Sequence, residues 1–484
     1  MKTKYWLGVI FILLIMTSIA FSTRYYGSAD IGDYSDSAKF FAGHYSASTR
    51  SSHSYLFGFI HSPLVSLFKS FFVFKITSIL FLILIIFSVY FITNKNKKAL
   101  LLMLTSPVIW YMAPWINPIQ MASLLFLWAF YFIEKYDKKN NLKYLAYSGI
   151  LIGLGWAIWD TILILAVFLI ASFLFEKKFY HFPYLLLFII IGLSPRLVLD
   201  QILFNFPLYT ILKSTLGTIA NISGGIYAIA DGWTPKSFAN IFSMLLAIPI
   251  MYWLCYDPTF FKNNKKIITF LSLSLVLFLF NPQIRYMLVL VPIMIILIGK
   301  KMSKKQFKIQ IISSLIILLL FTMPYIIQIN HSVDESIQGK EFNYFLDKSF
   351  LIELNETFVE DLIREDLRDI TARYPNEVFV VGNHPDSYQT LAHAYWGNNI
   401  KEFISIQDYE IYLSGNEVIF EKILKPTSNI KNRREIWIGG GMNKRESGID
   451  YSSIRYLITL EDNSNLENFQ LIVKYKKLDL WEKI

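Results

Sequence analysis

The sequence predicts a polytopic α-helical membrane protein with about eleven transmembrane helices and a separate C-terminal α/β domain. Of its 484 residues, 54% are hydrophobic and 17% are charged, whereas soluble globular domains contain about 25% charged residues. Long apolar runs alternate with short lysine clusters as far as residue 330, a pattern typical of membrane-spanning helices and their connections. Beyond that point the long apolar runs stop.

Eleven apolar segments are each suited to crossing a bilayer, which takes about 20 residues of helix. They are residues 5–22, 71–92, 99–113, 117–133, 142–158, 161–175, 183–198, 237–254, 267–281, 284–299 and 307–329. The first could also be a cleaved signal peptide, because it has a basic start and small residues near Ser18 and Ala20. Its length and the sequence that follows it favour a retained helix.

The lysines predict the orientation of these segments. Residues 1–330 contain 28 Lys and Arg against 10 Asp and Glu. If the N-terminus is cytoplasmic, every second connection is lysine-rich and 19 of the 28 basic residues lie inside, as the positive-inside rule requires. We therefore expect a multi-pass protein of the cytoplasmic membrane with two long extracytoplasmic pieces, 23–70 and 199–236. This arrangement of lysines indicates that the protein lies in a lipid bilayer and does not bind nucleic acid.

Residues 331–484 form the second predicted domain, distinct from the membrane domain at 1–330. They contain 18 Lys and Arg against 26 Asp and Glu. Strand-like segments occur at 378–381, 402–405, 435–438, 454–460 and 469–475, with a helix-like segment at 387–396. An odd number of spans places this domain outside, on the same side as the two long pieces.

Polar residues of the membrane domain concentrate at the predicted outer face. Six of the ten carboxylates fall there, and two arginines lie at the outward ends of predicted spans. With three histidines of the first loop, the set is Asp30, Asp33, Asp36, Asp160, Asp200, Asp231, Arg196, Arg285, His44, His53 and His61. Ionisable groups in such a place are costly and usually functional, and a boundary of this kind suits a substrate with a polar head and a lipid tail.

The densest part of the first loop carries a spaced motif. Asp30 is followed by Tyr34 four residues later, by Ala38 and Lys39 eight and nine residues later, and then by Gly43. This spacing resembles the first extracytoplasmic loop of the GT-C glycosyltransferases, polytopic enzymes that use polyprenyl-phosphate sugars.

Other segments carry the same resemblance. Asp36 matches a second Asp of the mannosyltransferase branch, although Ser28 stands where that branch often has an acidic residue. Residues 59–64, Phe-Ile-His-Ser-Pro-Leu, resemble the element that closes the loop in these families. Residues 285–292, Arg-Tyr-Met-Leu-Val-Leu-Val-Pro, resemble a stretch near their late spans.

The resemblance implies a hexosyltransferase that moves a monosaccharide from a polyprenyl or dolichyl phosphate to a glycan, glycolipid or protein acceptor by a single inverting displacement. Asp30 is then the general base, with Asp33 and Asp36 as further catalytic candidates. Arg285 is the first candidate for the donor phosphate, and Arg196, His61 and Lys39 are weaker ones, while Tyr34 and Tyr286 position the substrate. The chemistry needs these residue types, because a carboxylate can accept the hydroxyl proton and a guanidinium can bond two phosphate oxygens.

Each of these residues also has a structural interpretation. Asp30 could form a turn with Gly32, and Asp33 could cap a helix that begins near Tyr34. Asp36 and Lys39 could be an exposed ion pair, and Arg285 could be an interfacial anchor. The three histidines and three aspartates of the first loop could hold a divalent cation, but their spacing matches no tight metal motif, so no cofactor or metal ligand is assigned.

Two other functions compete with the glycosyltransferase. A transporter or flippase of lipid-linked sugars needs charges within its spans, and here only Lys75 is placed that way. A non-catalytic membrane scaffold would make the loop motif a coincidence.

Overall fold

The computed structural model describes most of the first 330 residues and part of the remainder. The described residues are 2–23, 34, 37–38, 41–42, 54–68, 72–174, 181–215, 235–255, 257–299, 301–330, 366–367, 369–375, 377–381, 402–405, 454–460, 468–476 and 478–484.

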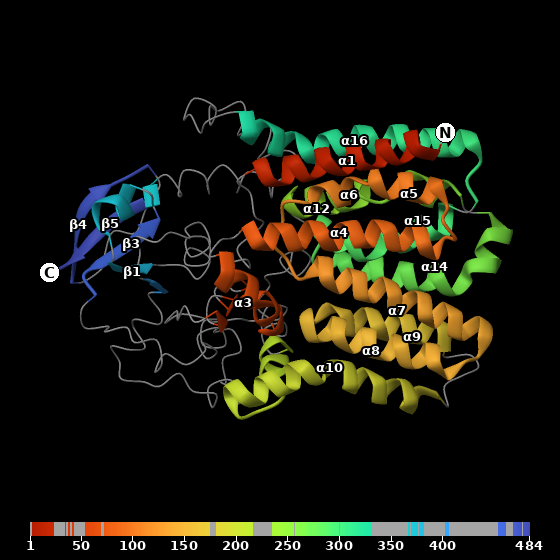
Figure 1. Ribbon diagram of the computed structural model, residues 1–484, viewed down its shortest axis with the longest axis horizontal. Coiled ribbons are helices and arrows are strands. Elements are labelled where there is room, and N and C mark those ends of the chain that lie inside the picture. Colours follow the sequence, from red (N-terminus) through yellow and green to blue (C-terminus); the bar gives the residue numbers. More distant parts are fainter. Residues whose placement is uncertain are drawn as a thin grey trace.

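All eleven predicted spans are helical, and the helices lie side by side along one direction (Figure 1). Their bounds are α1 (Lys2–Ser22), α4 (Phe72–Ile92), α5 (Lys97–Leu104), α6 (Pro107–Tyr111), α7 (Ile119–Lys139), α8 (Leu142–Ile158), α9 (Thr161–Leu174), α10 (Phe182–Phe204), α12 (Pro235–Leu246), α13 (Ile250–Leu254), α14 (Pro258–Leu279), α15 (Met287–Gly299) and α16 (Lys304–Asn330), with a short 3₁₀ turn, η2 (Ile284–Tyr286), before α15. Within the described residues, four helices are long and apolar enough to cross a membrane on their own: α1, α4, α10 and α16. The protein is thus a polytopic α-helical bundle, as predicted.

Two predicted spans are broken, where the sequence predicted continuous helices. The segment 99–113 divides into α5 and α6 just before Pro107, and the segment 237–254 divides into α12 and α13 at Pro249. Proline has no N–H to continue a helix ladder. At the second break, a side chain of α16 replaces a helical hydrogen bond. Gln310 Oε1 accepts a hydrogen bond of 2.9 Å from the backbone N–H of Met251.

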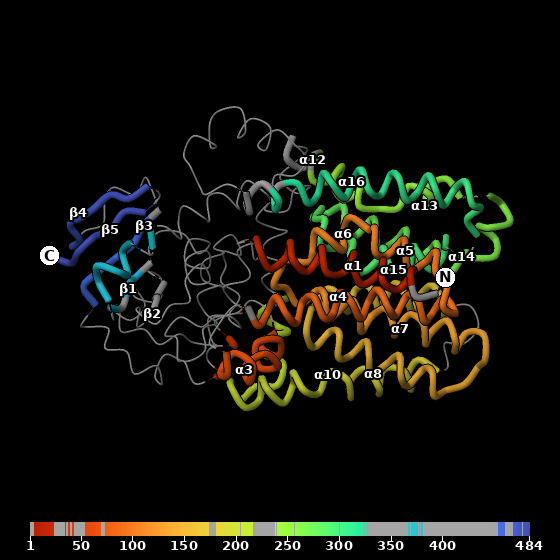
Figure 2. Tube along the Cα trace, turned by 45° about the horizontal axis from the view of Figure 1, so that its top comes forward, coloured from red at the N-terminus to blue at the C-terminus, as the bar shows by residue number. Residues whose placement is uncertain are grey.

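The first long loop contains a helix that was not predicted. Helix α3 (Leu56–Phe68) lies inside the stretch 23–70, which was assigned as a connection. The hydroxyl of Ser54 begins the helix by accepting a hydrogen bond of 3.1 Å from the N–H of Leu56. Figures 1 and 2 both place α3 beside the C-terminal end of α10. We call this end of the bundle the α3 end and the opposite end, where the lysine clusters lie, the lysine end.

Glycines bring α8 and α10 into close contact. A Cβ on Gly153 would lie 2.1 Å from the carbonyl oxygen of Ile189, and one on Gly192 would lie 2.2 Å from that of Ile150. Neither distance is possible for a real side chain, so only glycine permits this approach. Small residues serve the same purpose in many membrane helix pairs. The contact fixes α10 against α8 just before both helices reach the α3 end.

The C-terminal strands form a mixed five-stranded sheet in the order β2-β1-β3-β5-β4. The strands are β1 (Val378–Val381), β2 (Glu402–Ser405), β3 (Tyr456–Leu460), β4 (Phe469–Lys474) and β5 (Leu478–Lys483). Strand β1 pairs in parallel with β2 and β3, whereas β5 runs antiparallel to β3 and β4. Four of the predicted strands are found, β5 was missed, and the predicted segments 387–396 and 435–438 lie outside the described residues. The division into domains at residue 330 and the side of the membrane on which the sheet lies stay predictions.

Candidate active site at the α3 end

The structure describes only part of the predicted site. Asp30, Asp33, Asp36 and Lys39 lie outside the described residues, and so do His44, His53 and Asp231. Tyr34, His61, Arg196, Arg285 and Tyr286 are described.

Two described residues of the first-loop motif pack against the ends of α8 and α10. Tyr34 and Ala38, two residues of the loop motif, are buried in one apolar cluster with Ile158 of α8 and Leu199 of α10. Both are in helical conformation, which agrees with the prediction of a helix beginning near Tyr34. The Tyr34 ring also meets Phe57 of α3 edge to face, with 5.4 Å between ring centroids.

A glycine of α3 permits this packing. A Cβ on Gly58 would lie 2.1 Å from the Ser37 hydroxyl and 2.8 Å from the backbone nitrogen of Ala38. The side chain of any other residue would therefore push the motif segment away from α3. The positions of Ser37 and Ala38 thus depend on this contact.

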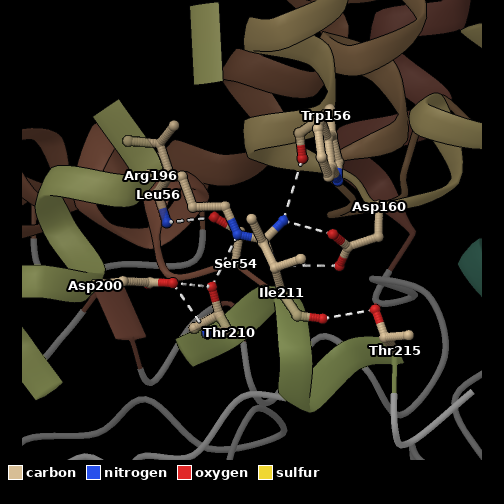
Figure 3. Close-up of polar contacts among 9 residues, drawn as sticks. All are labelled: Ser54, Leu56, Trp156, Asp160, Arg196, Asp200, Thr210, Ile211 and Thr215. Carbon is tan, nitrogen blue, oxygen red and sulfur yellow. Dashed lines mark hydrogen bonds and ion pairs between the residues drawn. The ribbon is translucent and has the colours of Figure 1, made fainter. Parts of the chain in front are cut away.

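Arg196 is fully buried at the α3 end and holds three elements together (Figure 3). Its Nη1 donates to Asp160 Oδ1 at 2.5 Å and to the carbonyl oxygen of Trp156 at 3.2 Å, and its Nη2 lies 3.4 Å from Asp160 Oδ2. Its Nε donates to Thr210 Oγ1 at 2.8 Å. Trp156 and Asp160 lie at the end of α8, and Thr210 lies in the chain that follows α10.

Thr210 connects this arginine to a second carboxylate. The Thr210 hydroxyl donates to Asp200 Oδ2 at 2.7 Å, and the Thr210 backbone N–H donates to the same oxygen at 2.9 Å. The other oxygen of Asp200, Oδ1, is buried and has no hydrogen-bond partner among the residues that the structure describes. Asp160, Arg196, Thr210 and Asp200 form one chain of polar contacts, which we call the Arg196 network.

The local sequence explains why Arg196 reaches this position. It follows Gly192 by one helical turn, so it emerges on the face that contacts α8. Pro195 lies just before it and cannot donate to the carbonyl of Ile191, but the Ser194 hydroxyl does so at 2.7 Å. The helix therefore continues to Asp200 despite its internal proline.

Arg285 lies in the 3₁₀ turn η2, with 9% of its surface exposed. Its Nε donates to the side-chain oxygen of Gln283. The guanidinium carbon is 5.9 Å from the Trp115 ring centroid and 5.6 Å from that of Tyr286. Faces of aromatic rings favour a nearby cation, so the two rings hold the guanidinium in place.

Tyr286 connects Arg285 to the Arg196 network. Its ring is stacked between Trp159, at 5.8 Å, and Phe278, at 5.1 Å. Trp159 directly precedes Asp160, the carboxylate that pairs with Arg196. The two arginines predicted to bind phosphate are thus brought to the same end of the bundle, although 89 positions separate them in the sequence.

Lys75 binds the C-terminal end of α1, where the first loop begins. It is 1% exposed, and its ammonium donates to the carbonyl oxygens of Ala20, at 2.9 Å, and of Thr23, at 2.6 Å. These carbonyls end α1, where a cation complements the helix dipole. Lys75 therefore lies at the α3 end and not in the middle of a span, as the sequence had placed it.

His61 is buried in α3, and both of its ring nitrogens have protein partners. Nδ1 bonds to the Phe57 carbonyl oxygen at 2.8 Å, and Nε2 bonds to Thr77 Oγ1 at 2.9 Å. Its ring also stacks on Phe74. These contacts favour a structural role that joins α3 to α4 over the predicted contact with phosphate.

Sequence reasoning assigned no role to several residues of this site. Asp160 and Asp200 were noted only as outer-face carboxylates. Gln283 and Thr210 carry no pattern in the sequence that marks them as members of the site. Among the residues described, no group of three or more His, Cys, Asp or Glu side chains could hold a metal ion.

The fold resembles that of solved structures over its whole length. No protein-family model matches the chain, and no curated protein matches it in sequence. The structure of ArnT from Cupriavidus metallidurans bound to undecaprenyl phosphate matches with a TM-score of 0.62 and 9% identity, over 100% of this chain and 99% of ArnT. The structure of the same protein in the apo state matches with a TM-score of 0.56 and 10% identity, over 100% and 98% of the two chains. The protein therefore has the fold of ArnT, which agrees with the polytopic architecture that the sequence predicts.

Proposed function

We propose that this protein is a membrane glycosyltransferase that takes a monosaccharide from a polyprenyl phosphate and transfers it to a glycan, glycolipid or protein acceptor. The observation that carries the proposal is the fold match to a structure bound to undecaprenyl phosphate, which extends over the entire chain. The contacts at the α3 end support it, because two arginines lie there together with Tyr34 and Ala38, two residues of the first-loop motif.

The proposed reaction is a single displacement at the anomeric carbon. Asp30 accepts the proton of the acceptor hydroxyl while the hydroxyl oxygen attacks the sugar. A new glycosidic bond forms, the bond to the phosphate oxygen breaks, and polyprenyl phosphate leaves with the electron pair. Attack from the face opposite the phosphate inverts the configuration.

Arg285 is proposed to stabilise the charge that develops on the departing phosphate. A guanidinium keeps its charge in a partly buried site and can donate to two phosphate oxygens at once. Its position between the Trp115 and Tyr286 rings fixes its direction before the donor arrives. Preorganised donors of this kind account for much of the rate enhancement in enzymes.

The lysine pattern favours the extracytoplasmic side as the location of this chemistry. The position of Lys75 also weakens the transporter alternative, because its ammonium binds the carbonyls at the end of α1 and does not line a path through the bilayer. The long loops and the C-terminal domain are proposed to hold the acceptor.

The proposal is tested with purified protein and several labelled polyprenyl-phosphate sugars. We expect transfer with at least one donor, and we expect Asp30→Asn to lower its rate about 10²- to 10⁴-fold, as the loss of a general base does. The matched control is Glu134→Gln, which replaces a carboxylate of α7 at the lysine end, away from the candidate site, and should leave the rate unchanged. Transfer by Asp30→Asn at the rate of the parent protein would remove Asp30 from the mechanism.

A further inference from the structure

A cavity at the lysine end is separate from the candidate active site. It has a volume of about 750 Å³ and lies among the end of α7, the end of α9 and the beginning of α14. Small-molecule sites usually occupy 300–1,000 Å³. The cavity is therefore large enough for a phospholipid head group and its glycerol.

The charges around the cavity are not balanced. Four lysines and two carboxylates line it: Lys138, Lys262, Lys265, Lys266, Glu134 and Asp137. Lys266 pairs with Asp137 at 2.8 Å, and Lys138 pairs with Glu134. Among the described residues, no ion pair joins Lys262 or Lys265 to a carboxylate. Lys262 and Lys265 are exposed and place two positive charges at the cavity.

A break in α14 shapes this edge of the cavity. Asn264 has non-helical backbone angles, with φ −124° and ψ 17°. Its side-chain amide donates to the Phe260 carbonyl oxygen at 2.9 Å, the acceptor that a regular helix would give to the backbone N–H of Asn264. The side chain thus stabilises the bend between Lys262 and Lys265.

The remaining lining is apolar and continues along α14. Phe173, Ile267 and Leu273 line the cavity. Leu273 is also exposed, as are Val276 and Phe280 beyond it. Spacings of three and four residues put these three side chains on one face of the helix. Lysines at the cavity followed by exposed apolar residues along α14 suit a phospholipid, because its phosphate lies at the interface and its chains extend into the bilayer.

From these observations we propose that the cavity binds the phosphate of an anionic phospholipid at the cytoplasmic face, with Lys262 and Lys265 as its ligands. An acyl chain of the lipid then contacts Leu273, Val276 and Phe280 of α14. Basic pockets between membrane helices on this side commonly bind anionic head groups. The proposal concerns the opposite face from the candidate active site and does not depend on the glycosyltransferase assignment.

The experiment is native mass spectrometry of the full-length protein released from nanodiscs of phosphatidylglycerol or of phosphatidylcholine. We expect one phosphatidylglycerol retained in preference to phosphatidylcholine. The double variant Lys262→Ala/Lys265→Ala should bind it roughly 20-fold more weakly, since each lysine near a membrane surface contributes several-fold to the affinity for anionic lipid. The control is Lys304→Ala/Lys305→Ala, which removes two exposed lysines of α16 outside the cavity and should change the affinity less than twofold.

Three results would overturn the proposal. The first is equal retention of phosphatidylglycerol and phosphatidylcholine. The second is an equal loss of affinity for phosphatidylglycerol in the cavity variant and the control variant. The third is binding of inorganic phosphate that requires Lys262 and Lys265, without any preference for lipid. Thermal unfolding of each variant in detergent confirms that the affinity is compared between folded proteins. Because the readout is lipid retention, it is independent of sugar transfer.

Discussion

The two ends of the helical bundle use charged residues in opposite ways. At the α3 end, Arg196, Asp200 and Lys75 are almost fully buried, and Arg285 is 9% exposed. At the lysine end, Lys138 is 63% exposed and Lys266 is 35% exposed. These two lysines keep a larger part of their surface in water, where a charge costs less.

Burial at the α3 end has a different consequence. A charge removed from water is costly unless partners compensate it, and Arg196 and Lys75 have such partners outside their own helices. The partners fix the direction of the side chains before any substrate binds, which is the arrangement that catalysis requires. The comparison therefore supports the proposal that the active site lies at the α3 end.

The largest effect on stability is expected from Asp160→Ala. This change leaves the fully buried Arg196 without its carboxylate, and the loss of one member of a buried pair costs about 3–5 kcal/mol. Unfolding in detergent, followed by tryptophan fluorescence, measures it. The control at the lysine end is Glu134→Ala, which leaves Lys138 in water and should cost less than about 1 kcal/mol.

A double variant tests whether the unpaired charge of Arg196 causes the loss of stability. Replacing both members of the pair, Asp160→Ala with Arg196→Met, removes the uncompensated charge and should recover much of the lost stability. If Asp160→Ala and Glu134→Ala destabilise the protein equally, the two ends do not differ in the way described.

A smaller effect is expected from Gly58→Ala. The added Cβ would collide with Ser37 and Ala38, and overpacking of this kind costs about 1–3 kcal/mol. Because the first-loop motif must shift, the rate of sugar transfer should fall more than the stability alone explains. The control is Gly8→Ala in α1, where no atom lies within 4 Å of the new Cβ. A Gly58→Ala variant with the stability and rate of the parent would show that this contact does not position the loop.

The course of the chain through the membrane was predictable because it depends on local composition. Apolar runs of the right length and lysines at alternate connections are properties of short segments, and every predicted span contains helix. The breaks before Pro107 and at Pro249 were also signalled locally, by prolines within apolar runs. Helix α3 was missed because it is short and lies next to a loop rich in polar residues.

The contacts of the site were less predictable because they depend on distant partners. Composition placed Arg196 and Arg285 at the same face, but it did not indicate that Asp160 and Thr210 would surround the first and that Trp115 and Tyr286 would surround the second. The glycine contact between α8 and α10, which sets the position of Arg196, joins residues 39 positions apart. No periodicity within either helix reveals which face meets the other.

The most direct test of the central claim is the binding of undecaprenyl phosphate to purified protein in which Arg285 is replaced by glutamine or by lysine. A charged hydrogen bond to phosphate contributes about 1.5–3 kcal/mol, so we expect Arg285→Gln to bind the lipid roughly 10- to 100-fold more weakly, with Arg285→Lys between it and the parent protein. Unchanged affinity in a folded Arg285→Gln variant would contradict the assignment of the donor phosphate to this end of the bundle.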